Sequence, residues 1–192
     1  FAVLTTGLAQ AGILVQHTGM ANPTTEGFSL VADSREGHAP RGQADPNWKG
    51  EDSWWFACAN PADMVDSLGS YQYVPSTAQL SDMNAQGWQA EMRVLSNLAP
   101  DDGTDYGVGL VLQTTALDFE IYLGADSSNH VILYKWNGSG LSTIDIAVLS
   151  ADAYHTYALT AAPGATQASI SIDGATVGSI DGVVGSFSPY FG

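Results

Sequence analysis

Two carboxylates stand two residues apart in an otherwise apolar run, Leu117-Asp118-Phe119-Glu120-Ile121. Successive side chains of a β-strand point to opposite faces, so Asp118 and Glu120 are expected on one face, roughly 7 Å apart. Paired carboxylates are the groups that glycoside hydrolysis uses. The reverse face of the run is apolar and predicts core, so a solvated outer face explains the pair without catalysis. We therefore expect no catalytic residue, and catalysis by Asp118 and Glu120 is the alternative.

Two tryptophans lack an evident role in a core. Trp48 lies in a polar stretch beside Asp45, and Trp136 precedes Asn137 at a predicted strand end. Exposed aromatic rings bind sugars by stacking on the apolar ring faces, while nearby polar groups bind the hydroxyls. We therefore predict a ligand site formed by Trp48, Trp136, Asn137 and Asp45. At least two of the remaining tryptophans must face the core; these are Trp54, Trp55 and Trp88.

Two acidic clusters could hold a hard cation. The first comprises Asp101, Asp102 and Asp105, and the second spans residues 126–129, Asp-Ser-Ser-Asn. Ca²⁺ takes six to eight oxygen ligands, which such loops can supply. Both are also ordinary hairpin loops, because Asp, Asn and Ser favour turns. A calcium site at Asp101, Asp102 and Asp105 is a prediction, with the plain turn as the alternative.

The histidines and the single cysteine show no catalytic or metal-binding spacing. His17, His38, His130 and His155 lack a zinc motif, and His155 is expected to be hydrogen-bonded within the fold. Cys58 follows an apolar run and is expected to be a small buried hydrophobe. No cofactor is firmly predicted; Ca²⁺ is the possible one.

The elements that must position these residues are predicted to be short strands. Alternation predicts strands over 12–17, 27–31, 54–58, 71–74, 88–95, 106–113, 117–123, 130–136 and 142–149, with a helical turn near 80–85 and a long loop over 32–53. Trp88 and Ala90 share one face of their strand, opposite Gln89 and Glu91. Strands at this regular spacing indicate an all-β sandwich of two antiparallel sheets.

The clearest pattern is a β-meander over residues 154–180. His155 and Tyr157 share one face of its first run, and Pro163-Gly164 interrupts the pairing. In the second run Ala168, Ile170 and Ile172 alternate with Ser169, Ser171 and Asp173, as expected of a half-buried strand. Asp173-Gly174 predicts a tight hairpin.

The meander, with its Tyr-His-Thr-Tyr strand, Pro-Gly turn and Asp-Gly hairpin, resembles the penultimate hairpin of the concanavalin A-like lectin/glucanase superfamily. It is most similar to the laminin-G-like domains of bacterial surface proteins. The stretches 22–28 (NPTTEGF) and 87–94 (GWQAEMRV) resemble two further landmarks, so the resemblance covers most of residues 12–192. It implies a jelly-roll sandwich, and it bears less on function, since one fold hosts many functions.

The resemblance carries three further implications. Glucanases of the superfamily place their carboxylates as Glu-x-Asp-x-x-Glu on one strand, a motif missing from this sequence. The superfamily includes both calcium-dependent and calcium-free members. A segment like Ser188–Gly192 precedes one last strand in the family, and that strand is expected to be missing here, which would leave a sheet edge exposed.

The composition limits the partners. Five basic against 20 acidic residues give a net charge of −15, which argues against nucleic acid and against anionic membrane surfaces. Such acidity can reflect a cation-rich habitat, a cation ligand or solubility. No apolar run reaches the roughly 18 residues of a membrane span, and 192 residues suit one sandwich domain.

The first eleven residues resemble the end of a secretory signal, an apolar run followed by Ala9-Gln10-Ala11, a small-x-small cleavage site. Cleavage after Ala11 would make residues 1–11 a signal remnant and Gly12 the first mature residue. An ordinary N-terminal strand is the alternative. The prediction is a Sec-type signal and a secreted or cell-surface location.

Together these features predict a laminin-G-like β-sandwich over residues 12–192 that acts as a non-catalytic, lectin-like binding module. A glycan or another extracellular surface ligand is the expected partner. The alternatives are an adhesion or matrix protein that recognises protein, and a glycoside hydrolase without the usual motif.

Overall fold

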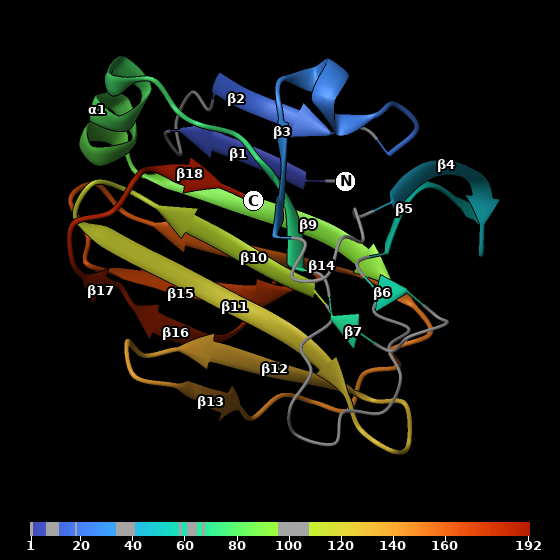
Figure 1. The fold of residues 1–192 in the computed structure, drawn as a ribbon. Coiled ribbons are helices and arrows are strands. Elements are labelled where there is room, and N and C mark those ends of the chain that lie inside the picture. Colours follow the sequence, from blue (N-terminus) through green and yellow to red (C-terminus); the bar gives the residue numbers. More distant parts are fainter. Residues whose placement is uncertain are drawn as a thin grey trace.

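Two antiparallel sheets lie face to face and form a β-sandwich, as the alternating pattern predicts (Figure 1). The computed structural model describes residues 2–6, 12–17, 19–33, 41–57, 59–60, 65–66, 68–95 and 108–192. One α-helix, α1 (Thr77–Gln86), lies at one end of the sandwich in these ranges. It begins at a capping box of Ser76 and Gln79, which satisfies two backbone N–H groups of its first turn. No helix in the described ranges is long and apolar enough to span a membrane.

The first sheet has the strand order β16-β15-β14-β9-β1-β2. Its strands are β1 (Ala2–Thr6), β2 (Gly12–His17), β9 (Trp88–Leu95), β14 (Tyr154–Ala161), β15 (Gln167–Ile172) and β16 (Ala175–Asp181). The predicted meander is confirmed as β14, β15 and β16. Asp173 and Gly174 have φ of 49° and 81°, the left-handed pair that a type I′ hairpin turn requires.

The second sheet has the order β13-β12-β11-β10-β18, with β17 beside β11. Its strands are β10 (Val108–Gln113), β11 (Leu117–Ala125), β12 (Val131–Trp136), β13 (Leu141–Ile144), β17 (Val183–Val184) and β18 (Tyr190–Phe191). The strand predicted over 142–149 was too long. Its pairing with β12 ends at Ile144, Val148 is 77% exposed, and Leu149 instead accepts a backbone hydrogen bond from Val131.

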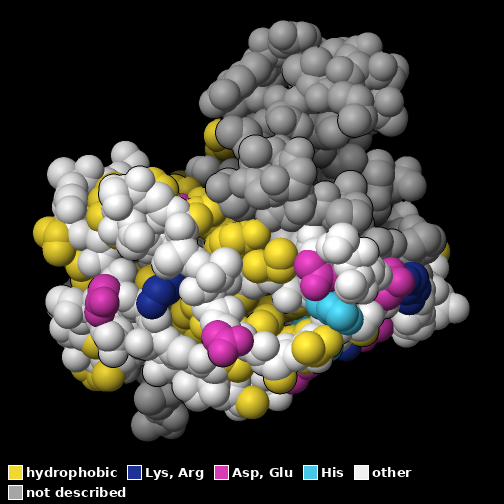
Figure 2. All heavy atoms as spheres, turned by 90° about the horizontal axis from the view of Figure 1, so that it is seen from below, with side chains coloured by type: hydrophobic (Ala, Val, Ile, Leu, Met, Phe, Trp, Pro, Cys, Tyr) yellow, Lys and Arg dark blue, Asp and Glu magenta, His cyan; other side chains and the backbone are white. Residues whose placement is uncertain are grey.

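The core fills the space between the sheets. Tyr157, Leu159 and Ile170 are completely buried, and Ile172 is 4% exposed. The serines that alternate with these isoleucines face away from the core, so the predicted faces of the meander are confirmed. Seen from the side of β13, hydrophobic side chains gather between the two layers, and acidic side chains are scattered singly around them (Figure 2). On this face the negative charge is therefore spread out.

Three two-stranded sheets and a 3₁₀ helix lie outside the main sheets. They are β3 (Ser29–Asp33) with β8 (Leu68–Gln72), β4 (Arg41–Trp48) with β5 (Glu51–Ala57), β6 (Ala59–Asn60) with β7 (Val65–Asp66), and η1 (Pro23–Glu26). The prediction of a loop over 32–53 was therefore wrong at Ala32 and Asp33, which belong to β3, and from Arg41 onward. Asn47, Lys49 and Gly50 have positive φ and turn β4 back into β5, a hairpin that the polar composition did not indicate.

Two ion pairs attach the β4–β5 hairpin to the sandwich. Lys49 Nζ lies 2.9 Å from Asp152 Oδ1, and Arg93 of β9 forms a two-point ion pair with Glu51. Arg93 also donates to Thr156 Oγ1 at 3.2 Å. Two of the five basic residues in the sequence, Lys49 and Arg93, thus form the ion pairs between this hairpin and the sandwich.

Residues 2–6, which the sequence assigned to a signal remnant, form β1 between β9 and β2. Ala9-Gln10-Ala11 lies outside the described residues, and so does Cys58. At the other end Phe191 pairs with Leu112 of β10 and bridges Tyr73, which places the C-terminal segment in the second sheet.

Candidate functional site

The outer face of the second sheet carries the polar and aromatic side chains that could bind a ligand or take part in a reaction. On β11 the odd-numbered side chains are core, with Phe119 1% exposed and Ile121 completely buried. Alternation then directs Asp118, Glu120 and Tyr122 to the outer face. The same-face placement predicted for Asp118 and Glu120 follows from this arrangement.

The register supplies their neighbours. Asp118 pairs with Gln113 of β10 on one side and Val183 of β17 on the other. Gln113 in turn pairs with Tyr190 of β18. Two parts of the chain that are distant in the sequence, the β10–β11 hairpin and the C-terminal strands β17 and β18, thus meet around one carboxyl group.

The strand β12 adds aromatic rings to this face. Tyr134 pairs directly with Tyr122, and Lys135 pairs with Ile121. The ladder between β11 and β12 ends at Ile121 and Lys135, and continuing its register by one residue brings Trp136 toward Glu120. Trp136 and Tyr134 are half-buried, so part of each ring faces solvent.

Among the predicted site residues, Asp118 has the environment that differs most from the one predicted. It is only 4% exposed, so the expected solvated outer face was wrong at this residue. The added segments β17 and β18, which the local pattern does not reveal, pair next to it and next to Gln113. Within the described part of the chain, Asp118 Oδ1 has no hydrogen-bond partner. Burial, followed by a hydrogen bond and the negative charge from Glu120, raises the pKa of Asp118 to about 7.

Two tyrosines complete the cluster. Tyr122 donates its hydroxyl hydrogen bond to Glu120 Oε2. Burial and the neighbouring Glu120 raise the pKa of Tyr122 above its usual range, and the same causes raise the pKa of Tyr190 to about 12. Both phenols therefore stay protonated at neutral pH and remain hydrogen-bond donors. We call Gln113, Asp118, Glu120, Tyr122, Tyr134, Trp136 and Tyr190 the carboxyl–aromatic face.

Sequence reasoning missed part of this face. The run Asp118-Phe119-Glu120-Ile121-Tyr122 contained a signal for Tyr122, since the alternation that pairs the carboxylates extends to the next residue of the same parity. Gln113 and Tyr190 carried no such signal, because they reach Asp118 through pairing across β10 and β18.

The predicted ligand residues are not brought together. Trp48 is the last residue of β4, and its neighbour Lys49 pairs with Asp152. Ala151 donates to the Asn129 carbonyl just before β12, whereas Trp136 ends β12. Trp48 therefore lies near Asn129, at the start of β12, whereas Trp136 lies at its end. Asn129 and Trp136 are seven residues apart in extended chain, which corresponds to about 23 Å.

Asn137 and Asp45 are also distant from each other. The side-chain oxygen of Asn137 accepts hydrogen bonds from Ser139 N, Ser139 Oγ and Gly140 N, which closes the turn between β12 and β13. Asp45 lies in β4, paired with Ser53. Asn137 is thus a turn residue beside Trp136, and Asp45 belongs to the hairpin at the opposite end.

The metal prediction falls outside the described ranges, because Asp101, Asp102 and Asp105 all lie in an undescribed segment. In the second cluster Asp126 Oδ1 accepts from Ser128 N and His130 N, which is an ordinary turn role. Among the described residues no three His, Cys, Asp or Glu side chains form a group that could hold a metal ion. Calcium binding stays a prediction.

His155 is hydrogen-bonded, as predicted. Its Nδ1 lies 2.7 Å from Asp173 Oδ2, and its Nε2 lies 3.2 Å from the Ser150 carbonyl oxygen. With both ring nitrogens engaged, His155 links the meander to the segment before β14.

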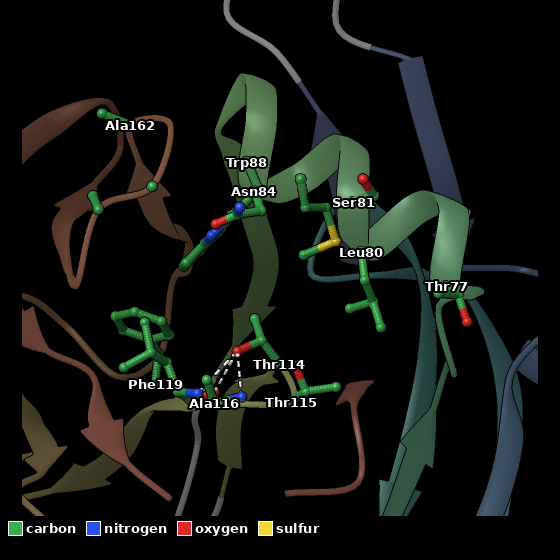
Figure 3. Close-up of a pocket in the computed structure, with 14 residues that line it drawn as sticks. Thr77, Leu80, Ser81, Asn84, Trp88, Thr114, Thr115, Ala116, Phe119 and Ala162 are labelled. Atoms are coloured by element: carbon green, nitrogen blue, oxygen red, sulfur yellow. Dashed lines mark hydrogen bonds between the residues drawn. The ribbon is translucent and has the colours of Figure 1, made fainter. Parts of the chain in front are cut away.

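A pocket of about 420 Å³ opens at the end of the sandwich beneath α1 (Figure 3). It is lined by Thr77, Leu80, Ser81, Met83, Asn84, Trp88, Thr114, Thr115, Ala116, Leu117, Phe119, Ala162, Gly164 and Ala165. Trp88 and Phe119 pack edge to face, with centroids 5.2 Å apart. Thr114 Oγ1 already accepts hydrogen bonds from Ala116 N and Leu117 N. None of these lining residues is titratable, and the pocket combines apolar side chains with the hydroxyl and amide groups of Thr77, Ser81, Asn84 and Thr115.

No protein-family model matches this sequence, and no curated protein is significantly similar to it. The resemblance to the concanavalin A-like superfamily therefore depends on the sequence motifs alone. A functional assignment has to come from the geometry of the carboxyl–aromatic face.

Proposed function

We propose that this protein is a non-catalytic carbohydrate-binding module whose ligand lies on the carboxyl–aromatic face. The observation that supports this most is the pairing of Tyr134 with Tyr122 on the face that carries Glu120. Continuing the same register brings Trp136 toward Glu120. Half-buried rings can stack on the apolar face of a sugar. The carboxylate of Glu120 and the amide of Gln113 can then bind its hydroxyl groups.

The wider proposal is a laminin-G-like, concanavalin A-like protein that a Sec-type signal delivers to the exterior or the cell surface. Calcium at Asp101, Asp102 and Asp105 is an optional part of it. An adhesion protein that recognises protein is the competing function, and it predicts self-association without sugar binding. The acidic surface supports a ligand other than nucleic acid.

The test is a glycan array with calcium and then with a chelator, followed by calorimetry on the best ligand. Trp136→Ala should weaken binding about fivefold or more, roughly 1 kcal/mol, because it removes the stacking platform. Tyr154→Ala is the matched control, a half-buried ring on the outer face of the other sheet. Equal affinity of Trp136→Ala and the unaltered protein would contradict the assignment to this face.

Trp48→Ala separates the two proposed locations. The sequence alone predicts a contribution from Trp48, whereas a site confined to the carboxyl–aromatic face predicts none. A loss only in Trp48→Ala would move the site to the β4–β5 hairpin.

Glycoside hydrolysis is the second candidate, because Asp118 has a pKa near 7 and holds a proton where a general acid needs one. Against it, a hydrogen bond that the protonated Asp118 donates to Glu120 contributes to that pKa. Hydrogen-bonded carboxyl groups lie closer than the roughly 5 Å between the two carboxyls of retaining enzymes. Release of reducing sugar that Glu120→Gln abolishes would favour hydrolysis over simple binding.

A further inference from the structure

The carboxyl–aromatic face contains a pair of carboxyl groups, one of which is buried and has no counter-ion among the described side chains. Asp118 is only 4% exposed and its Oδ1 has no partner within the described part of the chain, while the half-buried Glu120 accepts from Tyr122. The Asp118 carboxyl ionises at a cost, because its charge would lack water and would lie beside Glu120.

The three basic side chains whose contacts the structure describes are engaged elsewhere. Lys49 pairs with Asp152, Arg93 pairs with Glu51, and Lys135 donates to the Ser179 carbonyl oxygen at 3.0 Å. None of these three neutralises the pair, so a ligand or a proton can supply the positive charge that they do not.

The rings around the pair restrict the kind of cation. Tyr122 donates to Glu120, Tyr134 pairs with Tyr122, and Trp136 is the next residue of β12 with the same parity as Tyr134. Aromatic faces attract organic ammonium groups, and such a group also donates hydrogen bonds to carboxylates. Hard metal ions instead require several oxygen ligands. The combination of ring faces with a carboxyl pair fits a protonated amine.

We propose that the ligand of the carboxyl–aromatic face is a glycan that carries free, protonated amino groups, with one ammonium group bound at Glu120 between the rings of Trp136 and Tyr134. This inference rests on the proposed carbohydrate-binding function and specifies its ligand class. The overall charge of −15 attracts such a cationic glycan and repels an anionic one.

Binding of the amine has a consequence for the proton on the pair. The ammonium group stabilises the ionised form of both carboxyls, so Asp118 releases its proton to the buffer as the ligand binds. The O–H bond of the Asp118 carboxyl breaks, and the positive charge of the ammonium compensates the new carboxylate. A neutral sugar supplies no such charge and leaves the proton in place.

The experiment compares tetraglucosamine with its fully N-acetylated counterpart by calorimetry at about pH 5, where the amino groups of the sugar and the Asp118 carboxyl are both protonated. Repeating the titration in buffers of different ionisation enthalpy measures proton release. We expect at least tenfold tighter binding of the amine form, with release of up to about one proton per site. Glu120→Gln should remove this preference, and Glu91→Gln on the outer face of the other sheet should preserve it.

Equal binding of both tetrasaccharides, without proton release, would overturn the amine inference and leave carbohydrate binding intact. Binding of neither, together with an empty glycan array, would overturn the carbohydrate function itself. If Glu120→Gln fails to fold, Asp118→Asn is the second variant, since it should keep binding of the amine but abolish proton release. Proton release that persists in Asp118→Asn would contradict the role given to this carboxyl.

Discussion

At the scale of single residues, the position of Asp118 has the largest consequence. Its flanking residues Leu117 and Phe119 explain why the strand forms, but only the pairing with β10 and β17 explains why the carboxyl is buried. Burial of an acid beside a second acid leaves the neutral form favoured near neutral pH. Asp118 therefore links pH to the stability of the fold.

The expected pH dependence has a definite sign. Because the folded-state pKa is about 7 against an ordinary value of 3.8, the folded state binds more protons than the unfolded state between these values. The contribution of Asp118 to stability is fully present below about pH 4 and is lost as the pH rises through about 7. The total loss is of the order of 2–4 kcal/mol.

Asp118→Asn should remove this part of the pH dependence, since an amide does not ionise. Denaturant unfolding of both proteins from about pH 4 to 8 measures it, and the variant should gain stability relative to the unaltered protein as the pH rises. The lowered pKa values of Glu51 and Asp173 act in both proteins and cancel in the difference. Parallel curves would show that the Asp118 carboxyl does not titrate in this range.

At the scale of elements, the meander is the part of the fold that stabilises the core from one side. Ile170 is completely buried and Ile172 nearly so, whereas Ser171 between them is only half-buried. Ile170→Ala should lower the free energy of unfolding by about 2–5 kcal/mol, because a cavity replaces the side chain. Ser171→Ala should change it little. Chemical denaturation measures both, and similar losses would mean that the faces of β15 are reversed.

At the scale of the whole molecule, the N-terminal strand joins β2 to the rest of the first sheet. The strand β1 pairs with β9 on one side and with β2 on the other over five residue pairs each. Cleavage after Ala11 would remove β1, so a chain that starts at Gly12 should lose the pairing of β2 and several kcal/mol of stability.

This can be measured by comparing the thermal unfolding of residues 1–192 and 12–192. Hydrogen exchange at β2 and β9 reports where the loss occurs, with β15 as the internal control. An unchanged melting temperature would mean that β1 is dispensable. N-terminal sequencing of exported material then decides whether the mature chain begins at Gly12.

The sequence by itself determined the fold class and most strands. Alternation in β9, β14 and β15, together with the Asp173-Gly174 turn, is a local property, and local periodicity is enough to place side chains on faces. Alternation also placed Asp118 and Glu120 on one face of their strand. The sequence further predicted a helical turn near 80–85, where α1 lies. These features depend on residues a few positions apart.

Only the tertiary structure decided which faces are covered and which distant residues meet. The burial of Asp118 requires β17 and β18, which come more than 60 residues later in the chain. The polar composition of the β4–β5 hairpin did not indicate two strands. The separation of Trp48 from Trp136 follows from the extended length of β12. Strand pairing brings together residues that are far apart in sequence, so no local pattern could have predicted the carboxyl–aromatic face as a unit.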